Sequence, residues 1–188
     1  MSSASDLKTI ALAEFATSGY SGTSLSRIAE LAGLSKSSVL YHYASKEALL
    51  EAAVGPAIDR MADILDTTSA QPLTSDRRRE FIVGFVDFLL EYRLQVNLFI
   101  NQGPSLVDVP VVDRANALVV RLAEYFSSEV SDTEEQMRFG IALGGAAYTL
   151  CTMRSLELES PPVDEIRSAL ITVMTELLAP VAATATQE

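Results

Sequence analysis

The chain has 188 residues, of which 48% are hydrophobic and 21% charged, so it suits one or two globular domains with a buried core and is not a disordered chain. A single cysteine (Cys151) and a single histidine (His42) exclude an internal disulfide, a cysteine-based zinc cluster and histidine-pair chemistry, and we expect no metal and no cofactor. The N-terminus lacks a signal-peptide pattern, and the longest uncharged apolar stretch has 15 residues. A membrane span needs about 20, so a soluble, cytoplasmic protein is expected.

The net charge of −11 is unevenly distributed along the chain. Residues 1–50 carry four basic and four acidic side chains and sum to zero, whereas the other 138 residues carry ten arginines and 21 acids. An acidic surface repels a phosphate backbone. If any part of the chain meets nucleic acid, we expect it to be the N-terminal quarter.

Helical periodicity recurs throughout the chain, and strand-like alternation is never sustained. The first helix carries its apolar stripe over residues 7–15 and stops near Gly19; the second is capped by Thr23 or Ser24 and ends at Gly33. Ser35 caps a third helix that runs to about residue 43. A longer helix follows over residues 46–66, and Gly55-Pro56 is expected to interrupt it.

Five further helical segments are predicted in the rest of the chain. They cover residues 81–92, 96–100, 110–126 with Asp108 as the cap, a long stretch from Ser131 or Asp132 to about Leu158, and 163–178. The prediction is therefore an all-α chain of about nine helices.

Residues 23–46 have the pattern of a helix–turn–helix, two short helices joined by a glycine-containing turn. In DNA-binding proteins, the second helix of this unit enters the major groove. Its outward side chains would be small or able to form hydrogen bonds, namely Lys36, Ser37, Ser38, Tyr41 and His42. On this pattern alone, an ordinary helical hairpin is an equally good interpretation.

The order and spacing of short motifs resolve this ambiguity. Gly19-Tyr20, Thr23-Ser24-Leu25, Ala32-Gly33-Leu34-Ser35, Tyr41-His42-Tyr43 and Ser45-Lys46-Glu47 together closely resemble the N-terminal DNA-binding domain of the TetR family of bacterial transcriptional regulators. The resemblance implies a three-helix DNA-binding domain at residues 1–46 and a helical ligand-binding and dimerisation domain at residues 47–188. The DNA-binding residues that it implies are Thr23, Ser24, Ser35, Lys36, Ser37, Ser38, Tyr41, His42 and Lys46.

Some of these positions allow a second interpretation. The family usually has a phosphate-contacting tyrosine where this chain has Leu40, and Tyr41 next to it is a candidate substitute. Lys36 could read guanine or contact phosphate, and Arg27 could reach DNA or pair with Glu30. Lys46 could bind phosphate or be an ordinary solvated residue, and His42 could bind phosphate or be a surface histidine.

The last two long helices are apolar on more than one side, which predicts a second packing surface. We expect a four-helix dimer interface, with an unusually buried helix pair within a monomer as the alternative. The candidate interface residues are Gly144, Ala147, Cys151, Ile166, Leu170, Val173, Met174 and Leu177.

The middle of the chain is rich in aromatic side chains that could line an apolar ligand pocket, with Gln102 among its polar points. The candidates are Met61, Phe85, Phe88, Tyr92, Asn97, Phe99, Asn101, Phe126 and Tyr148, with plain core packing as the alternative. Gly55-Pro56 could be a tilting element between the two predicted domains or a passive kink.

The sequence as a whole predicts a dimeric regulator, expected to be a repressor, that binds a palindromic double-stranded DNA operator and is released by a small apolar or amphipathic inducer. An enzyme is not expected, because a di-iron helical bundle needs histidines that the chain lacks. The alternative is a helical adaptor whose N-terminal domain binds protein. The operator, the inducer and the sign of regulation do not follow from the sequence.

Overall fold

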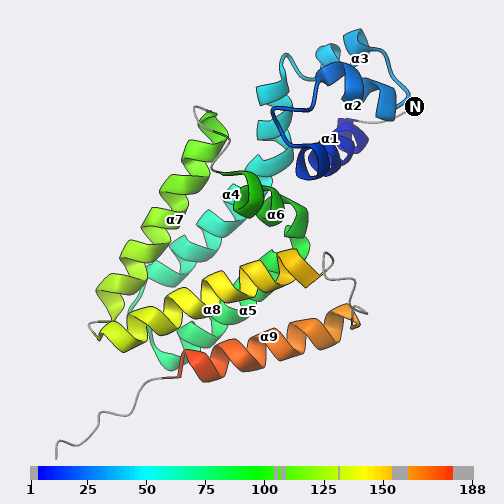
Figure 1. Ribbon diagram of the computed structural model, residues 1–188. Helices are drawn as coiled ribbons and strands as arrows, with labels where there is room; N and C mark the ends of the chain where they lie inside the picture. Colours follow the sequence, from blue (N-terminus) through cyan, green and yellow to red (C-terminus); the bar gives the residue numbers. More distant parts are fainter. Residues whose placement is uncertain (1–3, 104–105, 107–108, 131, 154–160, 180–188) are drawn as a thin grey trace, which may run out of the picture. The chain divides into compact units, whose positions relative to one another are not determined.

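A computed structural model describes residues 4–103, 106, 109–130, 132–153 and 161–179, and in this part the chain is all-α, as predicted (Figure 1). The helices of this part are α1 (Ala4–Ser18), α2 (Leu25–Leu31), α3 (Lys36–His42), α4 (Lys46–Ser69), α5 (Ser75–Glu91), α6 (Arg93–Gln102), α7 (Pro110–Glu129), α8 (Thr133–Thr152) and α9 (Val163–Leu177). No helix among them is long and apolar enough to cross a membrane.

The helix boundaries follow local chemistry. Ser24 caps α2 and accepts a hydrogen bond from the Arg27 amide, while Asp132 caps α8 by accepting from the Glu135 amide. Gly19 follows the end of α1 with a φ of 81°, and Gly33 lies in the turn after α2 with a φ of 66°. Residues that carry a Cβ rarely adopt a positive φ, so glycine suits both helix ends. These capping and stop predictions are confirmed.

Several predicted boundaries differ from the structure, and α5 and α6 each begin earlier than predicted, at Ser75 and Arg93. The expected interruption at Gly55-Pro56 is wrong, because α4 continues through it from Lys46 to Ser69. Proline removes a single backbone hydrogen bond, and Pro56 is exposed, so water can replace the missing donor. The long helix expected to reach Leu158 ends at Thr152 as α8, and residues 154–160, like Asp108 and Ser131, lie outside the described residues.

Contacts divide the chain into two units, Met1–Asp63 with Glu91–Val119, and Ile64–Leu90 with Val120–Glu188. In the first unit, α1, α2, α3, the start of α4 and α6 share one core, to which Phe15, Ile28, Val39, Leu49 and Leu98 contribute. The N-terminal helices therefore pack with α6 as well as with one another. The predicted division after residue 46 remains a prediction.

The second unit is built around aromatic rings from three helices. Phe126 of α7 stacks on Phe139 of α8 at 4.3 Å between ring centroids and meets Phe81 of α5 edge-on at 4.9 Å. α9 is held to α5 by Arg167, which donates two hydrogen bonds to the Asp87 carboxylate at 2.6 and 3.0 Å. Arg78 donates to the carbonyl of Leu178 directly after α9, where the helix dipole favours a positive charge.

The turn between α1 and α2 is held by a lysine from the start of α4. The Lys46 Nζ donates to the carbonyls of Tyr20 at 2.9 Å and Thr23 at 3.1 Å, and lies 4.2 Å from the centre of the Tyr20 ring. The Tyr20 hydroxyl donates to Glu47, and burial together with the Glu47 charge raises the pKa of Tyr20 to about 12. The phenol therefore stays protonated and able to donate above the pH at which an ordinary tyrosine ionises.

Replacing Lys46 by Met should destabilise the chain. The substitution removes the ammonium donor from the Tyr20 and Thr23 carbonyls, of which Tyr20 keeps the bond from the Thr23 amide, and it removes the cation–π contact. We expect a loss of about 1–3 kcal/mol in the free energy of unfolding. The measurement is chemical denaturation followed by circular dichroism.

The same substitution at the exposed Lys36 is the matched control and should change the free energy of unfolding by less than about 0.5 kcal/mol. Equal effects at the two lysines would contradict the assignment of Lys46 to the turn.

Candidate nucleic-acid interface

The helix–turn–helix is closed by backbone hydrogen bonds across its turn. The Leu34 amide donates to the Ala29 carbonyl at 2.8 Å, and the Ala32 amide donates to Ile28 at 3.0 Å. Ile28 of α2 and Val39 of α3 are both fully buried, so each helix turns one apolar side toward the core of the unit. This packing leaves the opposite side of α3 free to meet a ligand.

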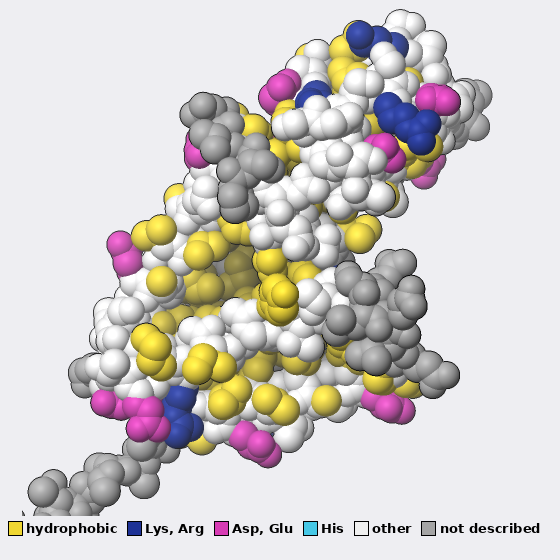
Figure 2. All heavy atoms as spheres, in the orientation of Figure 1, with side chains coloured by type: hydrophobic (Ala, Val, Ile, Leu, Met, Phe, Trp, Pro, Cys, Tyr) yellow, Lys and Arg dark blue, Asp and Glu magenta, His cyan; other side chains and the backbone are white. Residues whose placement is uncertain are grey.

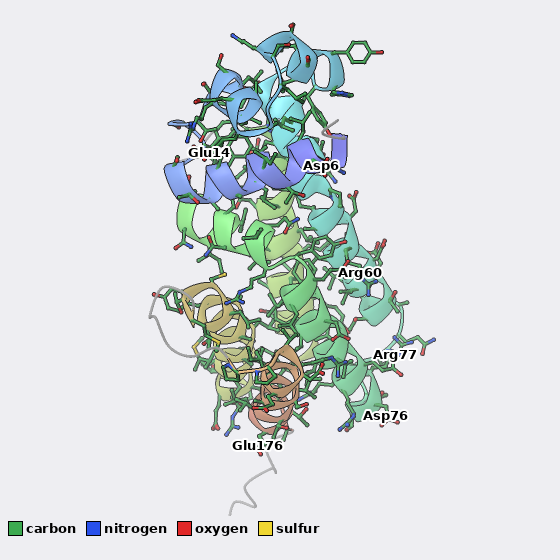
Figure 3. All side chains as sticks on the ribbon, turned by 90° about the vertical axis from the view of Figure 1, so that its right-hand side faces the viewer. Asp6, Glu14, Arg60, Asp76, Arg77 and Glu176 are labelled. Atoms are coloured by element: carbon green, nitrogen blue, oxygen red, sulfur yellow. The ribbon has the colours of Figure 1, made fainter. Side chains whose placement is uncertain are left out.

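The outer face of α3 is exposed and mostly polar (Figure 3). Lys36, Ser37, Leu40, Tyr41 and His42 are all exposed, and Tyr41 reaches 87%. The rings of Tyr41 and His42 meet edge to face with their centroids 5.4 Å apart. Four of these side chains can form hydrogen bonds and one is apolar, a mixture that suits the groove of a duplex.

Three serines form a hydroxyl network at the start of α3. The Ser35 Oγ accepts from the Ser38 amide at 3.1 Å and lies 2.9 Å from the Ser37 Oγ and 2.8 Å from the Ser38 Oγ. Ser35 caps the helix, Ser37 is exposed, and Ser38 is half-buried. These hydrogen bonds fix the orientation of the serine hydroxyls at the N-terminal end of α3.

Positive charge on this surface is scarce. In the part of the chain that the structure describes, Lys36 makes no ion pair. Arg27 of α2 pairs instead with Glu30 at 3.0 Å and with Glu14 of α1 at 3.6 Å, and Figure 3 labels Glu14 on α1. Of the two interpretations of Arg27, the pairing with Glu30 is the one that the structure contains.

Two predicted DNA-contacting residues lie elsewhere. Thr23 is 2% exposed, and its hydroxyl donates to the Gly19 carbonyl at 2.7 Å. Lys46 is half-buried with its ammonium on the Tyr20 and Thr23 carbonyls. Both side chains contact the α1–α2 turn in this conformation, whereas Ser24 is exposed. The phosphate contacts expected for Thr23, Ser24 and Lys46 remain predictions.

Gln102 is a residue whose role sequence reasoning missed. At the last position of α6, its Oε1 accepts from the Tyr20 amide at 3.1 Å, and its Nε2 donates to the Phe15 carbonyl at 3.0 Å. It therefore satisfies backbone groups at the end of α1 and in the turn that follows. Glutamine in a polar break has no sequence signal for such a distant partner, since 82 residues separate Gln102 from Tyr20.

The predicted ligand residues are divided between the two units. Met61, Phe85, Phe88 and Phe126 are buried, the last three among the aromatic rings of the second unit, whereas Tyr148 is 58% exposed. In the first unit Tyr92, Asn97 and Phe99 are half-buried, and the exposed Asn101 donates to the Asn97 carbonyl at 3.1 Å. The ring-to-ring contacts are those of a packed core.

The predicted interface residues on α8 and α9 differ in exposure. Gly144 and Val173 are exposed, and Ala147, Leu170 and Leu177 are half-buried, whereas Cys151, Ile166 and Met174 are buried inside the second unit. Larger exposed side chains accompany them: Met137 at 59%, Ile141 at 62% and Tyr148 at 58% on α8, and Val163 at 63% on α9. Figure 2 shows hydrophobic side chains gathered over the region of α8 and α9, with charged side chains toward its margins.

The N-terminal region matches a known family. Residues 9–53 match the sequence profile described as "Bacterial regulatory proteins, tetR family". Over 49 residues the chain is 49% identical to the HTH-type transcriptional regulator RutR of Escherichia coli (strain K12), which is 26% of this chain and 23% of that protein. The chain thus spans less than a quarter of the length of this curated relative.

In the described residues, no group of three His, Cys, Asp or Glu side chains could hold a metal ion.

Solved structures resemble nearly the whole chain. Mycobacterium smegmatis AmtR has a TM-score of 0.74 at 19% identity and covers 97% of this chain and 88% of its own. A TetR-family regulator from Streptomyces coelicolor A3 has a TM-score of 0.70 at 23% identity, and the match covers 93% of this chain and 91% of that chain. The ketosteroid transcriptional regulator KstR2 of Mycobacterium tuberculosis has a TM-score of 0.64 at 19% identity, and the match covers 92% of this chain and 93% of that chain. These proteins carry the names of regulators. Residues 9–53 are therefore similar to the helix–turn–helix region of TetR-family bacterial transcriptional regulators, and the described part of the chain has an all-α fold like that of the solved regulators.

Proposed function

We propose that the chain is a transcriptional regulator that binds double-stranded DNA through the outer face of α3. The observation that carries the proposal is the exposed set Lys36, Ser37, Tyr41 and His42 on one side of a helix whose other side is buried at Val39. The match of residues 9–53 to a DNA-binding family supports it. So does the neutral charge of residues 1–50 in an otherwise acidic chain.

The proposal extends to a homodimer formed through α8 and α9. An exposed stripe on α8 (Met137, Ile141, Tyr148) lies on one helix face at spacings of four and seven residues, with Gly144 between its members. Apolar side chains of this size on a continuous face favour burial against a partner. Two-fold symmetry would then present two α3 helices to half-sites about 34–36 Å apart, and the operator would be palindromic.

The finer part of the proposal is that a small apolar or amphipathic ligand releases the operator, so that the chain acts as a repressor. Its support is the similarity of the fold to that of KstR2, a ketosteroid regulator. The ligand would bind more tightly to a conformation in which the two α3 helices no longer match the spacing of the half-sites, and it would therefore favour that conformation.

The test of DNA binding is fluorescence anisotropy or gel shift with the DNA that flanks the chain's own gene, at low and moderate salt. Sequence-specific binding supports the proposal. Equal binding to scrambled DNA, or none, would favour the adaptor in which the N-terminal domain binds protein.

Replacing Lys36 by Met should weaken operator binding by about 5- to 150-fold, because Lys36 is the one Lys or Arg on the outer face of α3 among the described residues. The measurement is anisotropy with the selected operator and with operators changed at single base pairs. Loss of preference at one G·C pair would assign a base contact, and uniform weakening would assign a phosphate contact.

The control removes an exposed positive charge outside residues 9–53. Arg79 of α5 is exposed, and Arg79→Met should leave operator affinity within about twofold. Comparable losses for both variants would show that only overall charge matters, which would contradict a specific role of Lys36.

Operator affinity should depend weakly on salt. With Arg27 paired to acids and Lys46 bonded to carbonyls, few cations per half-site are free to neutralise phosphate. A dimer that uses about four such contacts should give a slope of about −4 in a plot of log K against log salt concentration. The measurement is a titration between about 50 and 200 mM salt, and a slope near −10 would contradict the charge analysis.

Replacing Ile141 by Arg should abolish the dimer. The side chain is 62% exposed on α8, so the single chain tolerates the charge, whereas a paired apolar face does not. Analytical ultracentrifugation should show a monomer, and operator affinity should fall with it. Val120→Arg is the control on α7 of the same unit, where Val120 is 55% exposed, and it should remain dimeric.

A further inference from the structure

The outer face of α3 includes one exposed apolar side chain. Leu40 is 40% exposed, while its neighbour Val39 is fully buried in the core of the unit. A residue one position along a helix is rotated by about 100°, so Leu40 lies outside the part of α3 that the core covers. It is four positions after Lys36, which places both on the same flank of the helix, next to Ser37 and Tyr41.

The chemistry of Leu40 restricts what it can contact. A leucine side chain has no donor or acceptor, so it cannot bind phosphate, sugar or the polar edge of a base. Lys36, Ser37, Tyr41 and His42 around it can all make such contacts, so any DNA docked on this face brings Leu40 within reach of base edges rather than solvent. In the major groove, the apolar group that a duplex offers is the C5-methyl of thymine.

We infer that Leu40 is a specificity-determining residue that packs on a thymine methyl group in each half-site. The inference rests on the proposed DNA-binding function and deepens it: one defined position of the operator carries thymine because Leu40 faces it. Tyr41, at 87% exposure, remains available for the backbone contact. The hydrogen-bonding residues of the face and its apolar residue thus have separate tasks.

The experiment removes the methyl group from the DNA and the apolar side chain from the protein. The full chain first selects its operator from a pool of random duplexes. Each thymine of the selected half-sites is then replaced by deoxyuridine, which lacks only the methyl group, and affinity is measured by anisotropy. One thymine per half-site should be sensitive, with a loss of about fourfold per methyl group and about fifteenfold when both half-sites are changed.

The same operators are then tested with Leu40→Ala. This variant should bind the unmodified operator more weakly and should show no further loss on deoxyuridine at the sensitive position, because the two changes remove one contact. Leu31→Ala is the matched control, since Leu31 is 43% exposed but lies at the end of α2. It should retain the full deoxyuridine sensitivity. Circular dichroism melting checks that both variants fold.

The outcomes separate this inference from the function on which it rests. If no sequence is enriched from the pool, both the DNA-binding proposal and the inference fail. If an operator is selected but no thymine is sensitive to loss of its methyl group, the inference fails and DNA binding stands. The same holds if Leu40→Ala keeps the full sensitivity. The deoxyuridine scan with the unchanged chain tests the thymine contact even if Leu40→Ala fails to fold.

Discussion

The N-terminal structure depends on the contacts that the Lys46 ammonium group makes with the α1–α2 turn. The ammonium lies over the Tyr20 ring and bonds two carbonyls of the α1–α2 turn, so one side chain joins the end of α1, the start of α2 and the start of α4. Gln102 completes the arrangement from α6 through the Phe15 carbonyl and the Tyr20 amide. Because α3 packs on α2, fixing this turn also fixes the face of α3.

The use of Lys46 inside the fold changes how DNA recognition must work. A chain with only four basic residues in its first 50 loses one to this turn and another, Arg27, to Glu14 and Glu30. Long-range attraction to phosphate is therefore modest, and the proposed interface relies on hydroxyls, rings and one leucine at short range. Such contacts depend on fit, so the rigidity provided by Lys46 and Gln102 bears directly on the proposed recognition.

The second unit separates interior and exterior apolar side chains along the same helices. On α8, Phe139 and Leu150 are buried with the aromatic rings, whereas Met137, Ile141 and Tyr148 point outward. Arg78 and Arg167 hold α9 through a carbonyl after α9 and through Asp87 of α5. The proposed ligand would have to compete with rings that already pack on one another.

Local chemistry in the sequence was enough to determine the helices, their caps at Ser24, Ser35 and Asp132, and the outward positions of α3, because these depend on neighbours within four residues. The residues that close the domain were decided only by the tertiary structure. Lys46 was expected to contact phosphate or solvent, and Gln102 to lie in a ligand pocket. Their hydrogen-bond partners lie 26 and 87 residues away along the chain, and no periodicity encodes such distant contacts. The continuity of α4 through Pro56 was likewise set by packing on both sides of the proline rather than by its local propensity.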